Sequence, residues 1–137
     1  MEIYKPYSNQ DKVPYVEGIR AGFPSPAEDF TEPTLDLNRY VIKNPASTFY
    51  ARISGSSMEG ADIHDGDIAV IDKSIEPSDG SIAVCLIDGE FTLKRIKVEK
   101  DKVWLMPANP QFSPILITEE NHFIVWGIVT FIIKQMR

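Results

Sequence analysis

A short turn rich in serine is the first place in this sequence where covalent chemistry is possible. Residues 53–60 read ISGSSMEG, so an apolar segment ends in small, flexible residues that can hold a hydroxyl at an exposed turn. Such a turn can present a nucleophile, and the backbone amides of Ser57 and Met58 are candidates to receive an oxyanion. Serine and glycine also cluster in ordinary surface turns, so the segment alone leaves both interpretations open.

A serine nucleophile needs a base, and the candidates are the histidines and the lysines. His64 follows Ser57 in a polar turn without a separate carboxylate to orient it, which argues against a histidine-based triad. In residues 91–98, FTLKRIKV, strand alternation places Lys94 and Arg95 on opposite faces, so one of them points inward. If that residue is Lys94, burial lowers its pKa and provides a neutral amine as general base. The alternative is that both side chains reach solvent from an edge strand.

Metal, phosphate and cofactor chemistry have no support in the sequence. His64, His122 and Cys85 do not occur in a recognised ligand spacing, so no metal is predicted. The segment 65–67, DGD, lacks the remaining ligands of a calcium loop, and no glycine-rich phosphate loop occurs. Cys85 lies in the apolar run 82–87, which is typical of a buried structural thiol. No cofactor is therefore predicted.

The composition indicates one ordinary soluble domain and argues against direct contact with DNA or a membrane. The chain has 137 residues with a formal net charge of −6, so it lacks the basic surface that direct, sequence-specific DNA binding requires. The longest apolar run, residues 123–133, is too short to cross a bilayer as a helix. Because the N-terminal residues also lack the features of a signal peptide, we expect a cytoplasmic protein with no membrane interaction.

Residues 1–46 differ from the rest of the chain because prolines interrupt them repeatedly and no apolar periodicity is sustained. They are predicted to form an extended N-terminal arm. A helix-start signature occurs at residues 25–30, SPAEDF, where a hydroxyl precedes proline and early acids. Residues 35–41 form a second possible short helix, with Leu35 and Leu37 as its expected inward residues.

Residues 47–137 carry the signals of a small antiparallel β domain, so the predicted fold class is mainly β. Phe49, Ala51 and Ile53 alternate with more polar residues, as in a half-buried strand. Turn signals at 65–67, 78–80 and 88–90 separate further apolar segments at 68–71, 81–87 and 91–98. Additional strands are predicted at 103–106, 115–117 and 123–133.

The last predicted strand, residues 123–133 with Trp126, has two possible positions. At a sheet edge it would pair with a copy of itself and form a homodimer. Inside the sheet it would pair only with strands of its own domain.

Three motifs, in their order and spacing, resemble those of a known family. Residues 54–58 (SGSSM), 65–67 (DGD) and 89–95 (GEFTLKR) resemble the self-cleaving Ser-Lys peptidases that include the LexA repressor and UmuD, a group called S24-like. Upstream, residues 21–27 (AGFPSPA) are similar to the self-cleavage segment of the UmuD-type members. Too few residues precede the predicted domain for the helix-turn-helix of a LexA-type repressor, so the resemblance favours the UmuD type.

The resemblance implies a fold, a site and a cellular role. The fold would be the β domain shared by the LexA C-terminal part and signal peptidases. Ser57 would be the nucleophile, Lys94 its base and Ser56 a bystander, and the bond between Ala21 and Gly22 would be cut. RecA filaments on single-stranded DNA would accelerate cleavage after DNA damage. The shortened homodimer would then join a UmuC-type translesion polymerase in SOS mutagenesis.

The predicted arm suits such a reaction, because about twenty extended residues span roughly 65 to 70 Å, more than the width of a domain of this size. Three other interpretations remain. A signal peptidase would need a membrane anchor, and a phage-type repressor fragment would have lost its DNA-binding part. In a non-enzymatic interaction module, Ser57 and Lys94 would be ordinary residues, and replacing Lys94 by alanine would change nothing.

Overall fold

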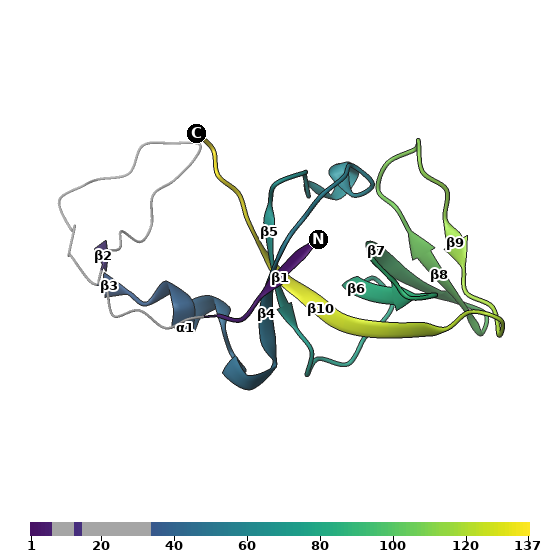
Figure 1. Cartoon of the computed structure of the whole chain (residues 1–137), viewed down its shortest axis with the longest axis horizontal. Helices are drawn as coiled ribbons and strands as arrows, with labels where there is room; N and C mark the ends of the chain where they lie inside the picture. The colour runs from purple at the N-terminus through teal and green to yellow at the C-terminus, as the bar shows by residue number, and fades with distance from the viewer. Residues whose placement is uncertain (7–12, 15–33) are drawn as a thin grey trace. The chain divides into compact units, whose positions relative to one another are not determined.

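The computed structural model describes residues 1–6, 13–14 and 34–137, which belong to two compact units (Figure 1). One unit contains Met1–Pro6 together with Asn44–Arg137, and the other is Tyr7–Lys43. The predicted helix at 25–30 and the Ala21–Gly22 bond lie outside the described residues. The predicted division into an arm over 1–46 and a domain over 47–137 stays a prediction.

The larger unit is built on one eight-stranded antiparallel sheet, which confirms the predicted mainly β fold. The strand order is β1-β4-β5-β10-β6-β7-β8-β9. The strands are β1 (Glu2–Tyr4), β4 (Thr48–Arg52), β5 (Ile68–Asp72), β6 (Ile82–Ile87), β7 (Glu90–Glu99), β8 (Lys102–Met106), β9 (Ile115–Leu116) and β10 (Phe123–Ile133). Two short 3-10 helices, η1 (Pro45–Ser47) and η2 (Glu59–Ala61), precede and follow β4. No helix in the described part of the chain is long and apolar enough to span a membrane.

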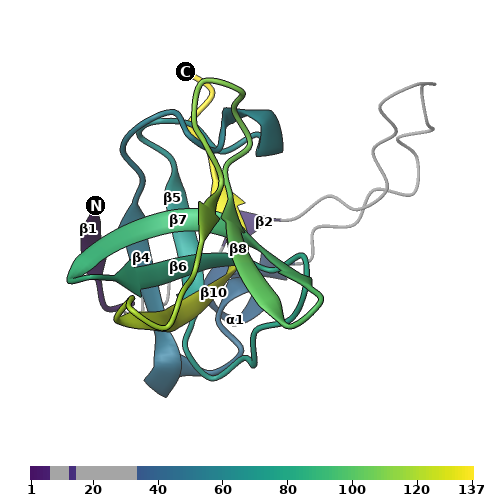
Figure 2. The same ribbon diagram turned by 90° about the vertical axis from the view of Figure 1, so that its right-hand side faces the viewer.

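Strand β10 joins the two halves of the sheet. Its first half pairs with β6 and its second half with β5, and the register shifts once in each half. In Figure 2 strands β6 and β7 run across the direction of β4 and β5. Gly127 borders the first shift, and a Cβ there would clash with the side chain of Ile71, so only glycine allows this close approach. The interior position predicted as one alternative for 123–133 is confirmed, whereas the homodimer stays a prediction.

The strongest of the predicted hairpins is the one that carries Lys94 into the sheet. Asp88 and Gly89 connect β6 to β7 with φ angles of 48° and 83°, the positive values that a tight hairpin turn requires. The other two turn signals also form turns, with Gly66 and Gly80 at positive φ. They do not produce tight hairpins: β4 and β5 are joined by the long segment 53–67, and β10 lies between β5 and β6.

The core consists of two clusters of buried apolar side chains. The first gathers residues from four strands and from the segment after β4: Ala51, Ile53, Met58, Ile63, Ala69, Ile71, Val84 and Leu93. The second joins β6, β7, β8 and β10 through Ala83, Cys85, Ile96, Leu105 and Ile128. Strand β1, which the sequence did not indicate, pairs with β4 and packs Ile3 against the first cluster.

The described part of the smaller unit contains a two-stranded ladder and one short helix. Strand β2 (Val13–Pro14) pairs with β3 (Thr34–Leu35), and α1 spans Leu37–Val41. Asp36 caps the helix by accepting a hydrogen bond from the Arg39 amide over 3.2 Å. The helix predicted over 35–41 is therefore present only over Leu37–Val41, because Leu35 belongs to β3. The expectation that Leu37 faces inward was wrong. Leu37 is 57% exposed, since this five-residue helix buries only its last residue, Val41.

Candidate active site

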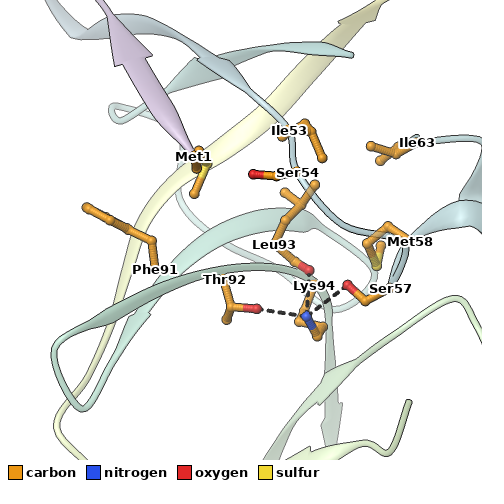
Figure 3. A pocket seen from close by; sticks show the side chains of 10 residues that line it. All are labelled: Met1, Ile53, Ser54, Ser57, Met58, Ile63, Phe91, Thr92, Leu93 and Lys94. Carbon is orange, nitrogen blue, oxygen red and sulfur yellow. Dashed lines mark hydrogen bonds between the residues drawn. The ribbon is translucent and has the colours of Figure 1, made fainter. Parts of the chain in front are cut away.

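Ser57 and Lys94 meet in a pocket between the segment after β4 and strand β7 (Figure 3). Each of the two residues adjoins a side chain of the first core cluster, Met58 beside Ser57 and Leu93 beside Lys94. Burial of these two neighbours fixes the backbone on both sides of the pocket. The other lining residues are Met1, Ile53, Ser54, Ile63, Phe91 and Thr92.

The side chain of Lys94 points into the molecule, whereas its neighbour Arg95 is exposed. Lys94 is only 8% exposed, as strand alternation allowed. Its Nζ lies 3.1 Å from Ser57 Oγ, 2.7 Å from Thr92 Oγ1 and 3.1 Å from the Leu93 carbonyl oxygen (Figure 3). The fold thus brings a hydroxyl and an amine that are far apart in the sequence within hydrogen-bonding distance of each other.

The environment of Lys94 makes its ammonium group easier to deprotonate than that of an exposed lysine. Burial lowers the pKa of its ammonium group, and the nearby Cys85 opposes this shift to a smaller extent. A neutral amine can donate its two hydrogens to Thr92 Oγ1 and the Leu93 carbonyl, which leaves its lone pair for the Ser57 hydroxyl. The arrangement can therefore accept a proton from Ser57 as a general base does.

Cys85 behaves as the sequence predicted for a structural thiol. Its side chain is fully buried in the second core cluster. Burial raises the pKa of the thiol to about 11, although the neighbouring Lys94 counteracts part of this effect. A thiol with so high a pKa is a poor nucleophile at neutral pH.

The turn that carries Ser57 is held by the segment Ala108–Asn109. The Ala108 amide donates to the Ser57 carbonyl over 2.7 Å, and Asn109 Nδ2 donates to the Ser56 carbonyl over 2.9 Å. Because the C=O and N–H of one peptide group point in opposite directions, the amides of Ser57 and Met58 point away from this segment. Within the described part of the chain, neither of these two amides donates a hydrogen bond. They are therefore free to receive an oxyanion.

The DGD turn supports the same segment from its other end. Asp65 Oδ1 accepts a hydrogen bond from the Gly55 amide over 2.8 Å. Gly55 has a φ of 94°, which side-chain-bearing residues rarely adopt. Ile53 exchanges backbone hydrogen bonds with Gly66 and Asp67. The motif therefore fixes the start of the turn.

Several positions considered in the sequence lie elsewhere, and others were missed. His64 contacts Lys134 and Asp62, and the His122 side chain is exposed. Among residues 1–6, 13–14 and 34–137, no group of three or more His, Cys, Asp or Glu side chains could hold a metal.

Asn109 was missed, since an asparagine in a polar segment is typical of any surface loop. Ala21 and Gly22 lie outside the described residues.

The sequence is similar to a known protein family and to several curated proteins. The family model described as Peptidase S24-like matches residues 14–130. The chain is 45% identical to SamA of Salmonella typhimurium over 123 residues, which cover 90% of this chain and 85% of SamA. It is 44% identical to MucA of Escherichia coli over 117 residues, which cover 85% and 80% of the two chains. With ImpA of Shigella flexneri the identity is 38% over 129 residues, covering 90% and 83%.

These three relatives are UmuD-like proteins, so the resemblance that the SGSSM, DGD and GEFTLKR motifs indicated is confirmed. The match covers most of the β unit together with part of the residues before it. This chain belongs to the Peptidase S24-like family.

Proposed function

We propose that this chain is a serine peptidase that cuts its own bond between Ala21 and Gly22, with Ser57 as the nucleophile and Lys94 as the base. The observation that carries the proposal is the 3.1 Å separation between Lys94 Nζ and Ser57 Oγ, which is a hydrogen-bonding distance. The lowered pKa of Lys94 and the two free amides beside Ser57 support the same chemistry.

In the first half of the reaction, neutral Lys94 takes the proton of Ser57 as Oγ bonds to the carbonyl carbon of Ala21. The oxyanion that forms accepts hydrogen bonds from the Ser57 and Met58 amides. The bond from Ala21 to Gly22 then breaks. The Lys94 ammonium returns its proton to the departing Gly22 nitrogen, and an ester between Ser57 and Ala21 remains.

In the second half, a water molecule replaces the departed amine. Lys94 takes a proton from the water as its oxygen bonds to the Ala21 carbonyl carbon. The ester bond to Ser57 breaks, and Ser57 Oγ regains a proton from Lys94. The products are a peptide that ends at Ala21 and a shortened chain that begins at Gly22. Each molecule performs this reaction on itself once.

The proposed role is SOS mutagenesis in the cytoplasm. The similarity to UmuD-like proteins supports stimulation of cleavage by RecA filaments on single-stranded DNA. It also supports a homodimer of the shortened chain acting as the accessory subunit of a UmuC-type translesion polymerase. The acidic net charge of −6 is consistent with protein partners rather than with direct, sequence-specific DNA binding.

The test is the intact mass of the purified chain after incubation at about pH 10, near the ordinary pKa of lysine, and at about pH 7. The expected product begins at Gly22, forms faster at high pH, and is absent from the Ser57→Ala and Lys94→Ala variants. Lys94→Arg is a sharper variant, because arginine keeps the charge and cannot supply a neutral base. Lys97→Ala, an exposed position on the same strand, is the matched control and should cleave normally.

A product from the Lys94→Arg chain at the normal rate would exclude Lys94 as the base. A product that begins elsewhere would exclude Ala21–Gly22 as the bond. An intact wild-type chain at both pH values, even when RecA filaments on single-stranded DNA are added, would leave the non-enzymatic module as the function.

A further inference from the structure

Strand β1 fills a position at the edge of the sheet that β4 would otherwise occupy. Its residues pair antiparallel with β4, Glu2 opposite Arg52 and Tyr4 opposite Tyr50, and Figure 2 shows the two strands side by side. Between them Ile3 lies opposite Ala51, which is fully buried. Covering β4 satisfies the backbone groups along its outer edge, which an uncovered strand leaves unpaired.

The contacts of residues 2–5 define what this edge recognises. Ile3 packs against the first core cluster, whereas Glu2 and Tyr4 are exposed. Lys5 Nζ lies 4.6 Å from the centroid of the Phe49 ring and 3.4 Å from the Ala46 carbonyl oxygen, for which it is a donor. The edge therefore offers an apolar site and an aromatic face for a cation. Arg52 places a positive charge at the register position of Glu2, whose carboxylate accepts a hydrogen bond from the Tyr4 hydroxyl.

Self-cleavage would cut the connection that keeps β1 in place. A three-residue strand is too short to be stable alone, and its chain connection supplies a high effective concentration beside β4. After a cut between Ala21 and Gly22, β1 belongs to a separate peptide, and it leaves as that peptide is diluted. Met1, which lines the pocket of Ser57 and Lys94, would leave with it.

We propose that self-cleavage empties this edge and that β4 then accepts an extended strand from a partner protein. That strand carries an acid, an apolar residue and a cation at the positions of Glu2, Ile3 and Lys5. The inference rests on the proposed function only for the event that releases β1. The residue types that the partner strand must carry are inferred from the contacts of β1, because the edge of β4 that β1 leaves suits a strand with the same pattern of residues.

The test uses the full chain and a fluorescent peptide of residues 1–6, MEIYKP, as the stand-in for the partner strand. Every chain carries Ser57→Ala, so that none cleaves itself. Ile3→Asp is added to release β1, since a carboxylate there would be buried against the apolar core cluster. Tyr4→Asp is the matched control, because the same charge on the exposed side leaves β1 in place. Fluorescence anisotropy at pH 7 measures peptide binding.

The peptide is expected to bind the Ile3→Asp chain and not the chains in which β1 is in place. A peptide with Asp at its third position should bind about tenfold or more weakly, since it loses the burial of one isoleucine. Adding Arg52→Glu to the Ile3→Asp chain should weaken binding of MEIYKP, and a peptide with Lys at its second position should restore it. Restoration would establish the register, because a nonspecific apolar contact does not depend on that charge.

Equal binding to all chains, or to none, would overturn the proposal, as would a peptide with Asp at its third position that binds as tightly as MEIYKP.

A second arm uses the wild-type chain after cleavage at about pH 10, which is verified by mass. The released peptide is removed by dialysis and the chain is returned to pH 7. This cleaved chain should bind MEIYKP as the Ile3→Asp chain does. If no cleavage occurs at about pH 10 or with RecA filaments on single-stranded DNA, the proposed function fails while the Ile3→Asp chain still tests the edge. If cleavage occurs and neither chain binds the peptide, the edge proposal fails while the proposed function stands.

Discussion

Asn109 Nδ2 donates a hydrogen bond to the Ser56 carbonyl over 2.9 Å, one residue before the proposed nucleophile. The Asn109 side chain is itself fixed, because its Oδ1 accepts a hydrogen bond from the Gln111 amide over 3.0 Å. This contact orients the peptide group whose N–H belongs to Ser57. Asn109 is therefore a positioning residue for the proposed oxyanion site.

Replacing Asn109 by alanine should slow self-cleavage by roughly tenfold to a hundredfold, because a small displacement of a reacting group costs that much. The pH at which the rate is half-maximal should stay the same, since Asn109 does not contact Lys94. Single-turnover cleavage followed by mass across a pH series measures both quantities. Asn121→Ala, in a loop beside Asp88, is the control and should cleave as wild type. An unchanged rate in Asn109→Ala would remove the positioning role.

Thr92 is expected to raise the pKa of Lys94 by accepting a hydrogen bond from its Nζ over 2.7 Å. The charged ammonium has three hydrogens to donate, so loss of an acceptor disfavours the charged form. Thr92→Val, which keeps the shape, should therefore shift the pH–rate profile of cleavage toward lower pH. Its maximal rate should also fall, because the amine loses one of its two orienting contacts besides Ser57. A profile shifted toward higher pH would contradict this role.

The carboxylate of Asp72 is expected to make the folding stability change with pH in the acidic range. Its side chain is 4% exposed, and hydrogen bonds from Asn44, Ser74 and Ser47 outweigh the burial that would raise its pKa, which is lowered to about 2. Because the folded pKa lies below the unfolded one, the stabilisation of about 2 kcal/mol is present above about pH 4 and lost as the pH falls through 2.

Urea unfolding at several pH values between 7 and 2 tests this role of Asp72. Asp72→Asn should be less stable at pH 7 and should lack this part of the acid dependence. Asp101→Asn, an exposed position, should keep the wild-type dependence. Parallel stability curves for wild type and Asp72→Asn would show that the carboxylate does not contribute.

The sequence predicted those parts of the fold whose causes are local. Asp88 and Gly89 suit a tight hairpin through their own conformational preferences, and alternation in 91–98 limited the inward choice to Lys94 or Arg95. Choosing between these two requires the neighbours of β7, since only the packed sheet shows which face is covered. The position of residues 123–133 was open for the same reason, because an apolar strand reads alike at an edge and in the interior.

The elements that were missed depend on contacts between distant segments. Strand β1 has three residues and no measurable periodicity, so only its pairing with β4 reveals it. Asn109 has its role because its loop lies against Ser56, more than fifty residues earlier in the chain. The inward face of α1 was misassigned, since Leu37 and Val41 are equally apolar and their burial depends on what packs beside them.

The pH dependence of self-cleavage tests the central claim, that a buried neutral Lys94 activates Ser57, most directly. The single-turnover rate, measured by intact mass from about pH 6 to pH 11, should rise with pH and level off at a midpoint below 10.5, the ordinary value for lysine, because burial lowers the pKa of Lys94. Lys94→Arg should show no such rise. A rate that is independent of pH, or a midpoint that is the same in wild type and Lys94→Arg, would contradict the account.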